Sequence, residues 1–62
     1  MIYERIKALC DERGIPIYQL EAKAGVSNGT IGAWRSADPK ASTLKKVADA
    51  LGVTVDELIK VP

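Results

Sequence analysis

Histidine is absent from the 62 residues, and cysteine occurs once, as Cys10. Without histidine, the chain lacks the commonest general base of enzymes and the commonest imidazole ligand of metal ions. A single thiol can form neither an internal disulfide nor a cysteine cluster around zinc. These absences exclude a disulfide-stapled secreted scaffold and argue against an enzyme, so we expect no metal and no cofactor.

Long apolar stretches are also missing, because no segment approaches the roughly 20 apolar residues of a membrane span. The N-terminus lacks the basic and then apolar pattern of a signal peptide. We therefore expect a cytoplasmic protein with no membrane partner. A chain of this length makes one domain at most, residues 1–62, whose small core leaves little room for a substrate cavity.

The net charge is only +1, but it is unevenly distributed along the chain. Residues 17–46 hold five basic and two acidic side chains, for a net charge of +3. The remainder holds four basic and six acidic side chains, for a net charge of −2. The positive middle of the chain is therefore the part expected to meet a polyanionic partner.

Apolar residues recur at spacings of three and four along nearly the whole chain, which is the period of amphipathic helices. Gly14, Gly25 and Gly52 each follow a periodic block and precede an apolar residue, as in helix ends closed by a left-handed glycine. These patterns predict an all-α fold of five short helices, over about 2–13, 16–24, 28–36, 43–51 and 55–60. Helices this short are not stable alone, so they must share one core.

Side chains that cap helix N-termini mark three of the predicted helix starts. Ser27 and Ser42 precede the third and fourth predicted helices. Thr54 and Glu57 have the spacing of a capping box at the start of the fifth predicted helix. The capping signals therefore support the third, fourth and fifth of the predicted helices.

Cys10 and Trp34 could have a functional role, but both fit better as residues of the core. Cys10 continues the apolar stripe of the first predicted helix, and we interpret it as an inert core thiol. Ile31 and Trp34 are three residues apart, so both should face inward. Trp34 is therefore interpreted as a core anchor and not as a platform for stacking bases.

Residues 25–27 alone join the second and third predicted helices, and so short a connection with glycine first is typical of a helix-turn-helix. Residues 17–34, IYQLEAKAGVSNGTIGAW, resemble the helix-turn-helix of the Cro/CI-type (lambda-repressor-like, XRE) family. Residues 44–58, LKKVADALGVTVDEL, look like the last two helices of that family. The matching positions in the first segment are Leu20, Gly25, Val26, Ser27, Ile31 and Trp34.

The resemblance implies a compact five-helix lambda-repressor-like bundle and a sequence-specific, DNA-binding transcriptional regulator similar to phage and prophage repressors. Residues 28–36 would be the recognition helix, which enters the major groove of double-stranded DNA. The family implies a homodimer on two half-sites about 34 Å apart. Candidate dimer contacts are Leu58, Ile59 and Val61, and closure of the core is the alternative interpretation of Leu58.

Two positions depart from the family pattern. Glu21 stands where many members have a small alanine after the leucine of the second helix. A carboxylate buried there without a partner would be costly, so we expect Glu21 to turn outward or to pair with a basic group. Ile17 stands where many members have a glutamine that contacts phosphate, and the nearest glutamine is Gln19.

Base contacts are expected from the outward face of the predicted recognition helix. Asn28 can donate to and accept from adenine in bidentate fashion, whereas Thr30 can bond a phosphate or touch a thymine methyl group. The glycines of this helix allow close approach to the base edges but offer no side-chain hydrogen bonds, so DNA shape should carry much of the specificity. An alternative is that these glycines are the result of neutral drift or mark a weak binder. The expected base contacts are Ser27, Asn28, Gly29, Thr30, Gly32 and Ala33.

Phosphate contacts are expected from the start of the second predicted helix, from the end of the third, and from the loop into the fourth. These contacts are Tyr18, Gln19, Arg35, Ser36, Lys40, Ser42, Thr43 and Lys46. The alternative function is an antitoxin or protein-interaction module on the same fold, which would need a protein partner. The low net charge and the sparse side chains of the expected reading face favour that alternative.

Overall fold

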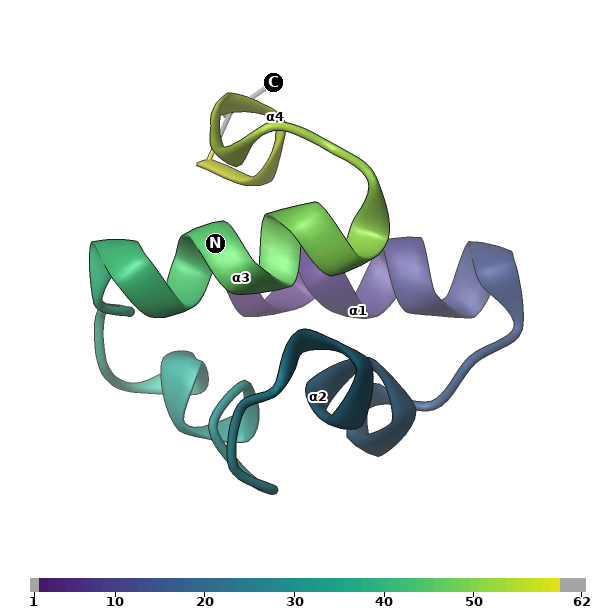
Figure 1. Cartoon of the computed structure of the whole chain (residues 1–62), viewed down its shortest axis with the longest axis horizontal. Coiled ribbons are helices and arrows are strands. Elements are labelled where there is room, and N and C mark those ends of the chain that lie inside the picture. Colours follow the sequence, from purple (N-terminus) through teal and green to yellow (C-terminus); the bar gives the residue numbers. More distant parts are fainter. Residues whose placement is uncertain (1, 60–62) are drawn as a thin grey trace.

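The computed structural model describes residues 2–59, and the structural statements below concern these residues. They form α1 (Ile2–Arg13), α2 (Ile17–Ala24), a 3₁₀ helix η1 (Gly32–Arg35), α3 (Ala41–Leu51) and α4 (Val55–Ile59) (Figure 1). This part of the chain has no strand, so the predicted all-α class is confirmed. The prediction of five α-helices is corrected to four α-helices and one 3₁₀ helix.

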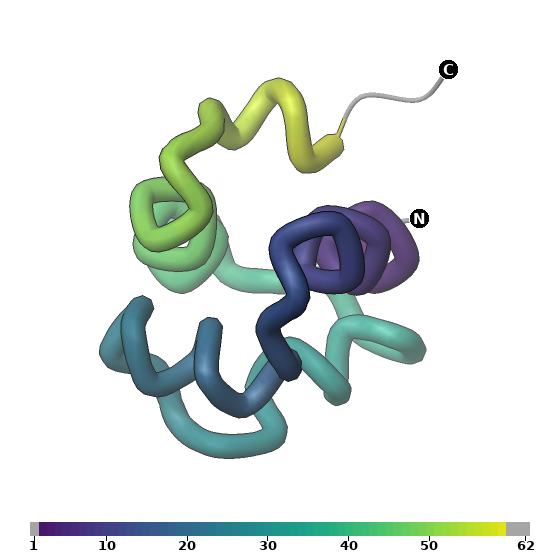
Figure 2. The backbone as a smooth tube through the Cα atoms, turned by 90° about the vertical axis from the view of Figure 1, so that its right-hand side faces the viewer, coloured from purple at the N-terminus to yellow at the C-terminus, as the bar shows by residue number. Residues whose placement is uncertain are grey.

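The helices surround a single core in a simple arrangement. Figure 2 shows α1 and α3 end-on, with α4 on one side of the pair and α2 and η1 on the other. In agreement with this view, both α2 and α4 pack against α1 and against α3, while η1 packs against α1. Within residues 2–59, no helix is long and apolar enough to cross a membrane.

Every element contributes to the core. Both Ile31 and Trp34 are buried, so their predicted inward orientation is confirmed. Cys10 is a fully buried thiol, and burial raises its pKa, which keeps it protonated and unreactive at neutral pH. The buried apolar residues are Ile6, Cys10, Leu20, Ile31, Trp34, Leu44, Val47, Ala48, Leu51 and Leu58.

Left-handed glycines end α1, α2 and α3, as the sequence predicts. Gly25, for example, has a φ of 74°, and the amide of Val26 donates to the carbonyl of Glu21 at 3.0 Å. These are the conformation and the hydrogen bond of a Schellman ending, which satisfies carbonyls that the helix itself leaves without a partner. The glycine therefore turns the chain sharply out of α2 toward the next element.

The predicted start of α4 is confirmed, whereas that of α3 is wrong. Thr54 Oγ1 accepts a hydrogen bond from the amide of Glu57 at 3.2 Å, as a capping threonine should. In contrast, α3 begins at Ala41 and no side chain caps it. The carbonyl of Lys40 accepts the amide of Leu44 at 2.9 Å, so Lys40 is the residue that precedes the helix, and the helix already contains Ser42.

Two arginines of α1 tie that helix to the C-terminal half of the chain. Arg13 donates to the carbonyl of Leu51, the last residue of α3, and Arg5 donates to the carbonyl of Glu57 at 3.1 Å. A cation at the C-terminus of a helix interacts favourably with the helix dipole and satisfies an otherwise unpaired carbonyl. These contacts fix the position of α1 relative to α3 and α4. Because η1 packs against α1, they also help to position η1.

Candidate nucleic-acid interface

The chain between α2 and α3 does not contain the predicted α-helix at 28–36. Residues 28–31 form hydrogen-bonded turns, and η1 follows as a 3₁₀ helix. The main obstacle to a regular helix is Gly29, whose φ is +93°. Glycine lowers helix stability by about 1 kcal/mol relative to alanine, and Gly29 and Gly32 both lie in this short stretch. In place of the predicted recognition helix, the structure has a turn at residues 28–31 followed by the short 3₁₀ helix η1.

Glu21 organises this turn from the neighbouring helix. Its side chain is only 2% exposed. Oε1 accepts a hydrogen bond from the amide of Gly29 at 3.1 Å, and Oε2 accepts one from the amide of Ile31 at 2.9 Å. The expectation that Glu21 turns outward or pairs with a basic group is wrong, because backbone amides satisfy the buried carboxylate.

The expected side-chain cap at Ser27 is also wrong. The residue before η1 is Ile31, and no side chain caps η1. Ser27 instead takes part through its carbonyl, which accepts the amide of Thr30 at 3.1 Å. The carboxylate of Glu21 thus takes over the role predicted for the Ser27 hydroxyl, because it already occupies two of the amides that need a partner.

The six residues predicted to contact bases lie together at the surface, and we call residues 27–33 the reading segment. Ser27, Asn28, Gly29 and Ala33 are exposed, and Thr30 and Gly32 are half-buried. Behind them, Ile31 is fully buried against the core. The segment therefore combines a fixed inner side with an accessible outer side, the arrangement that the sequence predicts.

The two glycines of the reading segment differ in whether the backbone conformation requires a glycine. Gly29 needs its left-handed φ of +93°, a conformation that other residues adopt only with strain. Gly32 has no positive φ, and a Cβ atom added there would meet only Arg35 Nη2, at an ordinary 3.8 Å. No contact among residues 2–59 therefore requires glycine at position 32.

Several expected phosphate contacts border the reading segment. A shallow hollow of about 350 Å³ is lined by Thr30, Ala33, Trp34, Ala37, Asp38, Lys40 and Thr43. Lys40 and Thr43, at the start of α3, thus lie next to Thr30 and Ala33 of the reading segment. Ser36 and Ser42 are exposed near it in sequence, and Tyr18 (67% exposed) and Gln19 are exposed on the first turn of α2.

Arg35 is held in place by contacts that the sequence analysis missed. Its guanidinium lies over the ring of Tyr3, 5.1 Å from the centroid, and its Nε donates to the carbonyl of Gly32 at 3.2 Å. The side chain remains exposed. A cation stacked on an aromatic ring loses little further freedom when it meets a phosphate. Tyr3 lies some 30 residues before Arg35, so the pairing had no local signal in the sequence.

Lys46 lies apart from this group. It lines a second hollow together with Lys23, Ala24, Asp49 and Ala50, where the end of α2 meets α3. The structure thus brings Lys40 and Thr43, but not Lys46, to the hollow beside the reading segment.

Two of the three predicted dimer contacts lie among the described residues, and these two differ in burial. Leu58 is 1% exposed and belongs to the core, which agrees with the alternative interpretation of this residue. Ile59 is 53% exposed, and Val61 lies outside the described residues. Ile59 is therefore the described candidate that presents apolar surface.

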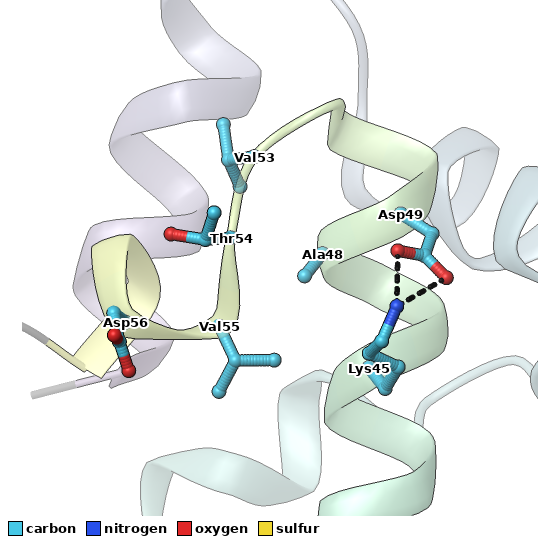
Figure 3. Close-up of a pocket in the computed structure, with 7 residues that line it drawn as sticks. All are labelled: Lys45, Ala48, Asp49, Val53, Thr54, Val55 and Asp56. Atoms are coloured by element: carbon cyan, nitrogen blue, oxygen red, sulfur yellow. Dashed lines mark hydrogen bonds and ion pairs between the residues drawn. The ribbon is translucent and has the colours of Figure 1, made fainter.

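A third hollow, of about 320 Å³, lies between α3 and the start of α4 (Figure 3). Ala48 and Val55 face each other across it, and Asp56 stands at its edge. Lys45 Nζ donates to both carboxylate oxygens of Asp49, at 2.9 and 3.1 Å. The lining of the hollow holds one lysine and two aspartates, Lys45, Asp49 and Asp56, so it offers little attraction for a phosphate.

The short turn from α2 into a surface segment backed by Ile31, within an all-helical fold, defines a helix-turn-helix protein. A family model described as helix-turn-helix matches residues 6–58. The chain belongs to this family, the Cro/CI-like (XRE) helix-turn-helix proteins. The match supports a DNA-binding helix-turn-helix regulator. Searches among curated proteins and among solved structures gave no significant match.

Proposed function

We propose that this protein is a sequence-specific regulator of transcription, similar to phage and prophage repressors, which places its reading segment in the major groove of DNA. The observation that carries the proposal is the accessible outer side of the reading segment, which includes the side chains of Ser27, Asn28 and Thr30. Ile31 anchors the segment to the core from behind, and Arg35 and Lys40 border it. The major groove of DNA is about 12 Å wide and displays the base edges that such side chains can contact.

Base recognition in this proposal depends on few side chains. Asn28 is exposed and can form paired hydrogen bonds with N6 and N7 of adenine. Thr30 can contact a thymine methyl group, and Ser27 can bond several bases. Gly32 has no internal reason to be glycine, which favours close approach of its backbone to the duplex. The remaining specificity would come from DNA shape.

Phosphate contacts would surround the reading segment on two sides. Lys40, Ser42 and Thr43 at the start of α3 would follow one strand, together with Arg35 and Ser36. Tyr18 and Gln19 on α2 would follow the other strand. Lys46 would contribute charge from farther away, beside Lys23. Such contacts fix the register of the protein on DNA and depend strongly on salt.

The test is the salt dependence of binding to double-stranded DNA. The logarithm of the association constant should fall linearly with the logarithm of salt concentration. Lys40→Ala should lower the slope by about 0.9, the expectation for one lost phosphate contact on a duplex. Lys7→Ala is the matched control, since Lys7 lies on α1 in an ion pair with Asp11 at 2.7 Å, and its slope should equal that of the unmodified chain.

A homodimer is part of the proposal, because one module this small makes few contacts and binds DNA weakly when alone. Ile59 and Val61 would form the contact, and two half-sites would lie about 34 Å apart. Sedimentation of the protein with a two-site duplex should show two chains per duplex, and Ile59→Ser should reduce this to one.

One observation favours a second function, that of an antitoxin or other protein-binding module. Gly29, Gly32 and Ala33 leave much of the reading segment without hydrogen-bonding side chains. A pure protein-binding module would show no affinity for random-sequence duplex in low salt, where a DNA-binding protein retains non-specific affinity. An antitoxin would still bind its operator and would in addition need a toxin as protein partner.

A further inference from the structure

The feature that the proposed function leaves unexplained is a buried carboxylate aimed at the reading segment. Glu21 is 2% exposed, and its two oxygens accept the amides of Gly29 and Ile31 at 3.1 and 2.9 Å. The two amides lie 8 and 10 residues farther along the chain, across the turn that ends α2. One side chain of α2 thus accepts hydrogen bonds from two amides within the turn at residues 28–31.

The conformation held by this carboxylate is one of several that the backbone of glycine can adopt. Gly29 has a φ of +93°, and its carbonyl accepts the amide of Ala33 at 3.1 Å. Both peptide groups of Gly29 are therefore bonded, one to Glu21 and one to η1. Charge-assisted bonds are the strongest of these contacts, and glycine has many competing conformations once they are removed.

We infer that Glu21 is a positioning residue for DNA recognition, because its carboxylate holds the reading segment in the conformation that presents Asn28 to the duplex. This inference rests on the proposed function. Glu21 does not touch DNA itself, since it is covered by its own chain. It acts through the backbone of Gly29 and Ile31, and so determines which way the intervening side chains point.

The first experiment compares DNA binding by two variants that remove the same negative charge at different positions. Glu21→Gln keeps the shape of the side chain, but its NH₂ group cannot accept a hydrogen bond, so one of the two bonds is lost. The change also raises the net charge from +1 to +2, which by itself strengthens binding to DNA. The control is Glu12→Gln, which makes the same charge change at an exposed position of α1.

If Glu21 positions the segment, Glu21→Gln binds a selected operator duplex about tenfold more weakly or worse, since only the chains with an ordered segment are competent. Glu12→Gln binds equally or more tightly. Equal or tighter binding by both variants would overturn the inference. Should Glu21→Gln fail to fold, Glu21→Asp replaces it, with Glu12→Asp as control, and the expected direction is the same.

A purely structural role is distinguished by Val47→Ala. Val47 is fully buried on α3, outside residues 27–33, so this variant lowers stability without removing a hydrogen bond of Glu21 to the reading segment. Affinities are compared after correction for the folded fraction. Val47→Ala should then match the unmodified chain, whereas Glu21→Gln should remain weaker and should prefer the operator less over random duplex. A loss that disappears with the correction would reduce Glu21 to a structural residue.

Nuclear magnetic resonance tests the anchoring without DNA. In Glu21→Gln the amide protons of Gly29 and Ile31 should shift and exchange with solvent about tenfold faster or more, while those of α1 do not change. Unchanged amides would refute the anchoring. If the unmodified chain fails to bind DNA, the proposed function is wrong, and this measurement still decides whether Glu21 holds the segment.

Discussion

The two glycines of the reading segment should respond oppositely to the same substitution. At Gly29, alanine would have to adopt a φ of +93°. Strain of about 1–3 kcal/mol at such a position exceeds the benefit of about 0.4–1 kcal/mol from a less flexible unfolded chain. Gly29→Ala should therefore lower the free energy of unfolding by about 1–2 kcal/mol. For a domain of this size, 1 kcal/mol changes the Tm by about 4–8 °C.

At Gly32 the backbone is compatible with alanine. The new Cβ would meet only Arg35 Nη2, at 3.8 Å, which is ordinary contact. Gly32→Ala should therefore stabilise the protein by about 0.4–1 kcal/mol. Urea unfolding of both variants, analysed with one common slope, measures the two changes on the same scale. Changes of the same sign would refute the account of either Gly29 or Gly32.

The Gly32→Ala variant also tests the proposed contact of this residue with DNA. If the backbone at Gly32 approaches base edges closely, Gly32→Ala weakens operator binding although the protein is more stable. Stability and affinity then change in opposite directions, which a general loss of folding cannot produce. Unchanged affinity would remove Gly32 from the contact surface.

The remaining predictions concern single side chains. Asn28→Ala should relax the operator preference at one position per half-site, with a loss of about 1–3 kcal/mol in operator selection, and an unchanged preference would exclude base reading by Asn28. Thr54→Ala should cost about 0.5–2 kcal/mol in urea unfolding, because the amide of Glu57 loses its capping oxygen. Burial raises the pKa of the Cys10 thiol, so its contribution to stability should be complete below the pKa of an unfolded thiol. That contribution should fall as pH rises through the raised pKa, whereas Cys10→Ala should not show this alkaline loss.

Most of the fold could be predicted because its signals are local. The stripe containing Cys10 predicts the whole of α1, and the apolar residue after Gly25 marks the end of α2. These signals need only the period of a helix and the conformational freedom of glycine. The start of α3 was misplaced because the carbonyl of Lys40, and not the side chain of Ser42, closes its first turn.

The reading segment was misjudged because its pattern is ambiguous. Ile31 and Trp34 are three residues apart, and that spacing places both side chains inward in an α-helix and in a 3₁₀ helix, which has 3.0 residues per turn. The inward orientation was therefore correct although the helix type was not. The low helix propensity of Gly29 and Gly32 was the available signal against a regular helix.

The role of Glu21 could not be obtained from spacing. Its hydrogen bonds reach amides that come close only after the chain has turned at Gly25 and packed Ile31 into the core. The sequence predicts a solvent-facing or ion-paired Glu21 because a carboxylate is costly to bury without a partner. This prediction is wrong because the partners are backbone amides of a neighbouring turn, which no pattern of side chains reveals.

The carboxylate of Glu21 has a consequence for how a nucleic acid can be held. Free amides at the beginning of a helical turn commonly receive a phosphate oxygen. Here the protein has already supplied its own anion at Gly29 and Ile31. In the proposed complex, this anion would repel a DNA phosphate from the two amides. We therefore expect the phosphate contacts to come from lysine, arginine and hydroxyl groups on either side of the reading segment.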